Sequence, residues 1–249
     1  MLYSPLEIFL IKPIVRIHNN WVDLSITNST IYLLISIVLI LTIMNNSIKG
    51  NKIIKGRWGS SIENMYVKIE EIVKEMIPGE YKRYIPLSII LFLFILTNNI
   101  IGLVPYSFTT TAHFIMTITM SLSIMIGVTL IGIYKHKFKF ITLFIPQGLN
   151  EGAVRIMIPL IFCIEIISYL IRVISLSVRL AANLMSGHTL LKILANFGLK
   201  YTISFPILLI IPVALISAVY LLEIGVAIIQ AYVFTLLTTT YIRDTELLH

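Results

Sequence analysis

The chain has 249 residues, of which 57% are apolar and only 12% are charged, whereas an ordinary soluble domain carries roughly 25% charged residues. This composition excludes a soluble globular protein and predicts a polytopic membrane protein. The net charge of +7 does not indicate nucleic-acid binding, because the basic residues gather in short segments between apolar runs. The single cysteine, Cys163, excludes an internal disulfide, and no metal-ligand pattern surrounds it.

The first apolar run with the length of a membrane span is residues 26–44. The mixed segment before it, residues 1–24, resembles neither a secretory signal nor a transit peptide, and we expect it to lie at the membrane interface. Four basic residues follow the run at once: Lys49, Lys52, Lys55 and Arg57. The positive-inside rule therefore places this loop on the matrix or cytoplasmic side and the N-terminus across the membrane.

Residues 61–76 place apolar side chains at helical spacing with acidic and basic residues between them. The pattern predicts an amphipathic helix that lies on the membrane surface or on a partner. Pro78 and Gly79 are expected to end it.

Residues 85–134 predict a hairpin of two apolar helices. The first helix carries a polar triplet that includes Asn99, and the second begins beside His113 and ends in a basic cluster, residues 135–139. This cluster again marks the positive side of the membrane. Asn99 is either a packing residue or part of a pathway lining, and His113 is either a hydrogen-bonded helix cap or a proton carrier.

The C-terminal half predicts a second and longer hairpin. Residues 141–159 contain prolines and charges and are interpreted as a re-entrant or interfacial lead-in. The apolar helix 160–194 would be about 50 Å long, well beyond a hydrocarbon core of about 30 Å, so it must tilt steeply. A loop at residues 196–204 is expected to precede the final helix, residues 206–240.

Arg179 stands in the middle of the long helix, and it is the residue that most needs an explanation. An arginine at this depth costs about 2.5 to 3.5 kcal/mol on insertion scales, and it cannot lose its proton. It therefore requires a carboxylate, a water-filled cavity or both, which indicates a functional site. The alternative is a structural role, either by snorkelling to a surface or by an ion pair with Glu165 or Glu223.

The helical face that carries Arg179 is defined by spacings of three, four and seven residues. Its members are mostly small or polar: Arg172, Ser175, Leu176, Ala182, Asn183, Ser186 and Gly187. For Arg172, a structural ion pair and a functional role are equally supported. Folding the hairpin about a turn near residues 201–204 brings Arg179 level with residues 223–230.

Five motifs in order carry a resemblance that covers nearly the whole chain: SPLEIF, TNNIIGLVPYSFTTTAHF, EIISYLIR, SLSVRLAANLMSGH and LLEIGVAIIQAYVFTLLTTTYIRD. They closely resemble subunit a of the F-type ATP synthase in its mitochondrial form. The resemblance implies a stator subunit that faces a rotating ring of c subunits and offers two offset half-channels for protons.

The resemblance also implies roles for individual residues. Arg179 would face the carboxylate of each passing c subunit and block a direct proton leak. Glu223 and His188 would handle protons in the intermembrane-space half-channel, and Glu165 with Asp244 would form the matrix-side exit.

Two amides complete the implied pathway, with Gln230 close to the arginine and Asn183 one helical turn after it. His188 lies about 180° from Arg179 on an ideal helix, so the two cannot share a face.

We therefore expect a single all-α membrane domain, residues 1–249. It would consist of one upright span, an amphipathic surface helix and two helical hairpins. The second hairpin, residues 160–240, would be tilted and would carry the proton path. The chain would be no enzyme by itself and would use no metal or cofactor, because it shows no catalytic nucleophile or phosphate loop. The family implies a c-subunit ring, the peripheral stalk subunit b, small membrane subunits, lipids and a dimeric complex as partners. It also implies the mitochondrial inner membrane, with the N-terminus in the intermembrane space and the C-terminus in the matrix.

Two other functions remain open at this point. A secondary transporter for protons or other ions would bind an anionic substrate with its membrane arginine, but it predicts internal repeats that are not visible here. A non-conducting assembly subunit would use the polar stripe only to dock a partner.

Overall fold

A computed structural model describes residues 9–16, 18–19, 22–23, 25–48, 57–77, 79, 81–104, 107–137, 158–202 and 210–246. Within these ranges six α-helices dominate: α1 (Asn28–Ile48), α2 (Arg57–Met76), α3 (Ile85–Leu103), α4 (Phe114–His136), α5 (Ile158–Thr202) and α6 (Ile210–Glu246). Five of the helical segments are long and apolar enough to cross a membrane, and α2 is not among them. The prediction of an all-α polytopic membrane protein is confirmed.

The N-terminal segment contains structure that the sequence pattern does not predict. Four very short strands form two antiparallel pairs: β1 (Pro13–Val15) with β4 (Ile26–Thr27), and β2 (His18–Asn19) with β3 (Val22–Asp23). The first pair brings the chain back to the start of α1, where Asn28 bonds to the backbone of Lys12. The expected interfacial segment, residues 1–24, is described only in part.

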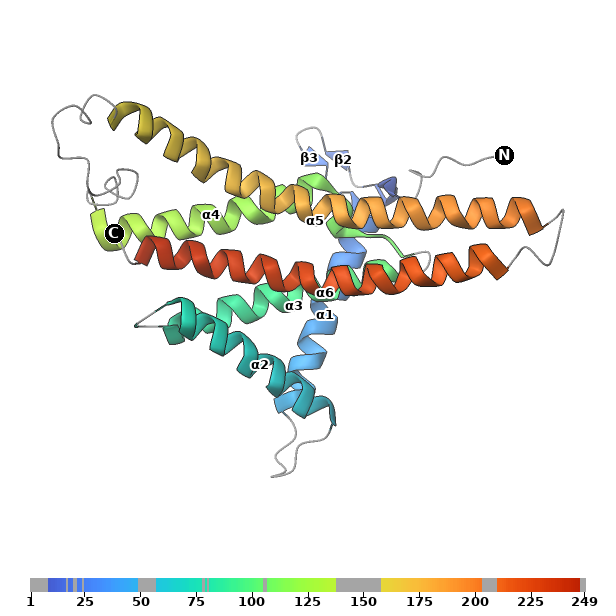
Figure 1. Ribbon diagram of the computed structural model, residues 1–249, viewed down its shortest axis with the longest axis horizontal. Coiled ribbons are helices and arrows are strands. Elements are labelled where there is room, and N and C mark those ends of the chain that lie inside the picture. Colours follow the sequence, from blue (N-terminus) through green and yellow to red (C-terminus); the bar gives the residue numbers. More distant parts are fainter. Residues whose placement is uncertain are drawn as a thin grey trace.

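Helix α1 runs across the other long helices in Figure 1, and α2 lies along one side of the assembly. Helix α2 begins at Arg57 rather than at residue 61 and ends at Met76, close to Gly79, whose φ of 125° suits a residue without a side chain. The predicted apolar face of α2 is used, because Ile69, Val73 and the adjacent Ile77 are buried in the core.

Helices α3 and α4 are joined by a turn that contains the short 3₁₀ helix η3 (Thr110–Ala112). Two side-chain hydrogen bonds fix this turn onto α3: Thr110 Oγ1 donates to Asn98 Oδ1 over 3.0 Å, and Thr111 Oγ1 donates to Asn99 Oδ1 over 3.1 Å. The close approach requires Gly102, because a Cβ there would meet Cγ2 of Thr109 at 2.6 Å.

Helices α5 and α6 lie side by side along the longest axis of the molecule (Figure 1) and form the antiparallel hairpin expected from the sequence. Leu180 of α5 and Phe234 of α6 are completely buried in the shared core. The loop predicted at residues 196–204 is wrong over its described part, because α5 continues through Thr202. A single glycine, Gly198, does not end a helix that packs on a partner helix, and tertiary contact outweighs its low propensity.

The predicted lead-in, residues 141–159, lies outside the described residues except for its last two, which already belong to α5.

Candidate functional site

Arg179 lies on the outer surface of the α5–α6 hairpin. Its side chain is exposed, and so are Ser175 and Ala182 one turn on either side of it, whereas Leu180 packs inward against α6. Leu176 departs from the predicted face, because it is only 3% exposed and belongs to the core. The arginine therefore stands on a face of small residues that another helix can approach closely.

Within the described part of the chain, no ion pair joins Arg179 to a carboxylate. The structural alternative, in which Arg179 pairs with Glu165 or Glu223, is therefore not what the hairpin forms. Glu223 lies beside His188 and Glu165 lies beside Arg172 instead.

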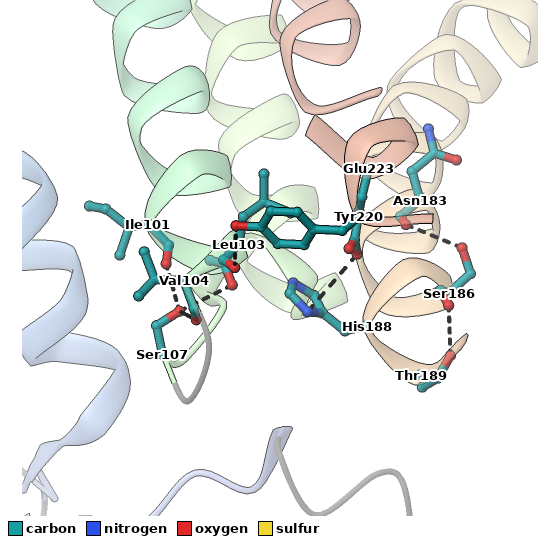
Figure 2. Close-up of polar contacts among 11 residues, drawn as sticks. Ile101, Leu103, Val104, Ser107, Asn183, Ser186, His188, Thr189, Tyr220 and Glu223 are labelled. Atoms are coloured by element: carbon teal, nitrogen blue, oxygen red, sulfur yellow. Dashed lines mark hydrogen bonds and ion pairs between the residues drawn. The ribbon is translucent and has the colours of Figure 1, made fainter. Parts of the chain in front are cut away.

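The second feature is a buried pair formed by His188 of α5 and Glu223 of α6, which point toward one another in Figure 2. Nδ1 of His188 is 4.0 Å from Oε1 of Glu223, and the side chains are only 13% and 4% exposed. Among the described residues neither Glu223 oxygen accepts a hydrogen bond, and Nε2 of His188 makes none. A buried carboxyl group without a fixed donor is well suited to gain and lose a proton.

Two amides join the helices between this pair and the arginine. Nδ2 of Asn183 donates to Oε1 of Gln230 over 3.0 Å, and Gln230 is 4% exposed. Arg179 lies one turn before Asn183 on α5. Because the helices are antiparallel, it is level with a residue one turn after Gln230 on α6, which is about Phe234. The predicted level, residues 223–230, is thus about one turn too early on α6, because α5 is longer than the sequence pattern indicates.

The third feature is a charged cluster around Arg172 of α5. Its guanidinium nitrogens lie 3.8 Å from Oε1 of Glu165 and 3.5 Å from Oδ2 of Asp244, and its Cζ is 5.9 Å from the ring centre of Tyr241. The three charged side chains are 36 to 43% exposed. Arg172 therefore forms an ion pair, which is one of its two alternatives, and Glu165 and Asp244, which the resemblance places together, converge on this one cation.

The remaining candidates, Asn99 and His113, lie in the α3–α4 hairpin. Besides accepting from Thr111, Asn99 donates through Nδ2 to the carbonyl of Ala227 over 3.3 Å, so this buried amide ties α3 to α6. His113 is the N-cap residue of α4, but its side chain makes no capping hydrogen bond and stacks on Phe108 at 5.0 Å. Burial holds the pKa of His113 below its usual value.

One polar cluster was not predicted from the sequence. Glu246, at the end of α6, accepts a hydrogen bond from Oη of Tyr84 over 2.6 Å and one from Nζ of Lys135 over 2.7 Å. The three residues come from the ends of three helices far apart in the chain, so no local pattern could have identified them.

No group of three His, Cys, Asp or Glu residues suited to a metal ion occurs in the described ranges.

Comparison with known proteins gives a consistent result. The family model described as ATP synthase A chain matches residues 28–243. A protein named ATP synthase subunit a from Trichophyton rubrum is 42% identical over 252 residues, which cover 99% of this chain and 97% of the relative. Proteins of the same name from Emericella nidulans and Zancudomyces culisetae are 44% and 38% identical, and they cover 99% and 100% of this chain and 97% and 100% of their own lengths. The chain therefore belongs to the ATP synthase A chain family.

Proposed function

We propose that this chain is the proton-conducting stator subunit of a rotary ATP synthase. Two half-channels pass protons to and from carboxylates of a c-subunit ring, and Arg179 prevents a direct leak between them. The observation that carries the proposal is the position of Arg179, an exposed cation on a small-residue face, between a buried acid–imidazole pair and a cluster of two carboxylates.

The entry half-channel ends at His188 and Glu223. A proton delivered from the intermembrane space binds to this pair and passes to a c-subunit carboxylate that returns from the lipid. Burial of Glu223 supports this role, because an ionised carboxylate with little access to water is costly and takes up a proton readily.

Arg179 acts on each loaded c-subunit carboxylate as it arrives at the hairpin. A fixed cation nearby favours the ionised form and so lowers the pKa of that carboxyl group, which releases its proton. Because Arg179 cannot itself be deprotonated, it does not pass protons along, and it separates the two half-channels.

The exit half-channel begins at the Arg172 cluster. Glu165 and Asp244 accept the released proton at the end of the hairpin where Lys135 and Arg243 also lie, and this basic end is assigned to the matrix. The membrane potential contributes about 2.3 kcal/mol per proton for each 100 mV. Asn183 and Gln230 hold the two helices in register between the half-channels.

The proposal includes the assembly and location that membership of the family suggests. The chain itself performs no nucleotide chemistry, which takes place in partner subunits. It sits in the mitochondrial inner membrane with its N-terminus in the intermembrane space and its C-terminus in the matrix, against a c-subunit ring, the peripheral stalk subunit b, small membrane subunits and lipids, in a dimeric complex. At 45 residues, α5 is about 68 Å long if straight, so it lies steeply tilted in a core of about 30 Å.

The test is ATP-driven proton pumping in membranes that carry Arg179→Ala, with assembly verified by copurification of the complex. An assembled complex that no longer pumps is the expected result. The matched control is Arg83→Ala, which removes an exposed arginine from the short 3₁₀ helix η2 (Tyr81–Arg83), outside the α5–α6 hairpin, and leaves pumping near normal. Near-normal pumping by assembled Arg179→Ala would instead favour the non-conducting assembly subunit and overturn the proposal.

A further inference from the structure

The N-terminal segment contacts the buried acid–imidazole pair, although the proposed proton path does not use it. The ring of Phe9 meets the ring of His188 edge to face, with centroids 6.5 Å apart and planes at 70°. Phe9 is partly buried and packs against the main core, whereas the next two residues, Leu10 and Ile11, are 54% and 52% exposed. Among the described residues 9–16, Phe9 is thus the side chain that turns inward.

Asn28, at the start of α1, holds the segment in this place with three hydrogen bonds. Its Nδ2 donates to the carbonyl of Leu10, its Oδ1 accepts from the amide of Lys12, and its own backbone amide donates to the carbonyl of Lys12, each over 3.2 Å. The bonds begin one residue after Phe9, so they hold the backbone beside its ring in place.

The pair beneath Phe9 is nearly sealed within the folded chain. Glu223 is 4% exposed and His188 is 13% exposed, so of the two the imidazole retains more contact with the surroundings. Gly187 lies directly against the Glu223 carboxyl group on the α5 side. On the α3 side, Oη of Tyr220 reaches the carbonyl of Leu103 over 3.4 Å, as Figure 2 shows. What covers His188 therefore governs how water reaches the pair.

We infer that Phe9 is the outer wall of the His188–Glu223 site and that Asn28 positions it there, so that the N-terminal segment restricts the access of water and small solutes to the pair. The functional meaning rests on the proposed proton path, since restricted access there would limit proton entry. The geometric claim does not depend on that path. Phe9 is a positioning and access residue and exchanges no proton.

The test measures access directly, with a cysteine reporter in the assembled ATP synthase. Because Cys163 is the only cysteine, a Cys163→Ser background allows one reporter, His188→Cys, to be modified by a small cationic methanethiosulfonate reagent. Phe9→Ala is expected to raise the rate of modification severalfold. Asn28→Ala is expected to raise it in the same direction. The matched control Leu10→Ala truncates the exposed neighbour and leaves the rate unchanged.

Equal rates with Phe9 and with Phe9→Ala, or an equal rise with Leu10→Ala, would overturn the inference. If Phe9→Ala prevents assembly, Asn28→Ala decides the matter, because it keeps the phenyl ring and removes the two side-chain hydrogen bonds that hold the segment, while the backbone bond to Lys12 stays. The rate of modification is independent of pumping. Failure of the proposed function would appear with Arg179→Ala in the pumping assay, whereas failure of this inference appears only in the labelling rates.

Discussion

Gly187 of α5 faces the carboxyl group of Glu223 on α6 so closely that a Cβ atom at position 187 would overlap Oε1 of that carboxylate. The next residue along α5, His188, contacts the same oxygen. The pair can form because the helix backbone itself, without a side chain, lies against Glu223. Gly187 thus determines how near the acid stands to the imidazole.

The first prediction concerns Gly187→Ala. The atoms in the way belong to the flexible end of Glu223, so we expect the helices to stay together while the carboxyl group turns away from His188. ATP-driven proton pumping should fall substantially in a complex that copurifies normally. The matched control is Gly127→Ala on α4, where a Cβ meets nothing within 4 Å and pumping should be unchanged. Full pumping by Gly187→Ala would show that the separation of the pair is not critical.

The sequence predicts the helices better than their ends. Apolar run length identifies each membrane helix, because hydrophobic length is a property of the segment itself. The predicted end of α5 is too early, since the helix continues past Asn196, where Gly198 packs against Pro212 of α6 and the contact outweighs local propensity. The sequence pattern does not predict the strands before α1, because strands of two or three residues are too short to show an alternating pattern.

The candidate site shows the same contrast between what a local pattern predicts and what depends on packing. Charge and depth alone single out Arg179, and the family resemblance assigns partners to Glu223 and Glu165. No pattern shows that Phe9 lies against His188, because the contact joins opposite parts of the sequence across the fold. Nor does a pattern show which carboxylate pairs with which cation, and Arg172, rather than Arg179, takes both Glu165 and Asp244.

The second prediction concerns the Asn183–Gln230 hydrogen bond. Gln230 is 4% exposed, and its Oε1 accepts the hydrogen bond from Asn183. The variant Asn183→Ala removes this bond, and Nε2 of Gln230 makes no hydrogen bond among the described residues. Leaving one buried partner unsatisfied costs about 1 to 3 kcal/mol, whereas replacing both partners by apolar groups is nearly neutral. We therefore expect Asn183→Ala to lower the thermal stability of the solubilised complex and Asn183→Ala/Gln230→Leu to restore most of it.

Thermal denaturation of the two variants beside the parent complex checks this asymmetry. A double variant that is less stable than the single variant by the full cost of a second lost contact would contradict it. Proton pumping by Asn183→Ala/Gln230→Leu is a second measurement. If this variant is stable but does not pump, the amide of Gln230 has a part in the proposed proton path besides its structural role.

The third prediction concerns the cluster in which Glu246 joins the ends of α3, α4 and α6. Two bonds hold its carboxylate, one from the hydroxyl of Tyr84 and one from the ammonium of Lys135. Tyr84 is 6% exposed, whereas the side chain of Lys135 is 48% exposed. A hydrogen bond to a charged group contributes about 1.5 to 3 kcal/mol, but an exposed ion pair contributes at most about 1 kcal/mol because water screens it. The hydroxyl of Tyr84 should therefore contribute more than the ammonium of Lys135 to the stability of this cluster.

We expect Tyr84→Phe to speed amide hydrogen exchange at the C-terminal end of α6 more than Lys135→Met does, with the middle of α6 unchanged in both variants. Tyr66→Phe is the control, because it removes an exposed hydroxyl from α2. Raising the salt concentration should bring the exchange rates of the parent and of Lys135→Met closer together, because salt screens the exposed ion pair. The faster exchange of Tyr84→Phe should remain. If Lys135→Met loosened the helix end more than Tyr84→Phe, the charge rather than the buried hydroxyl would hold Glu246, and this order of contributions would be wrong.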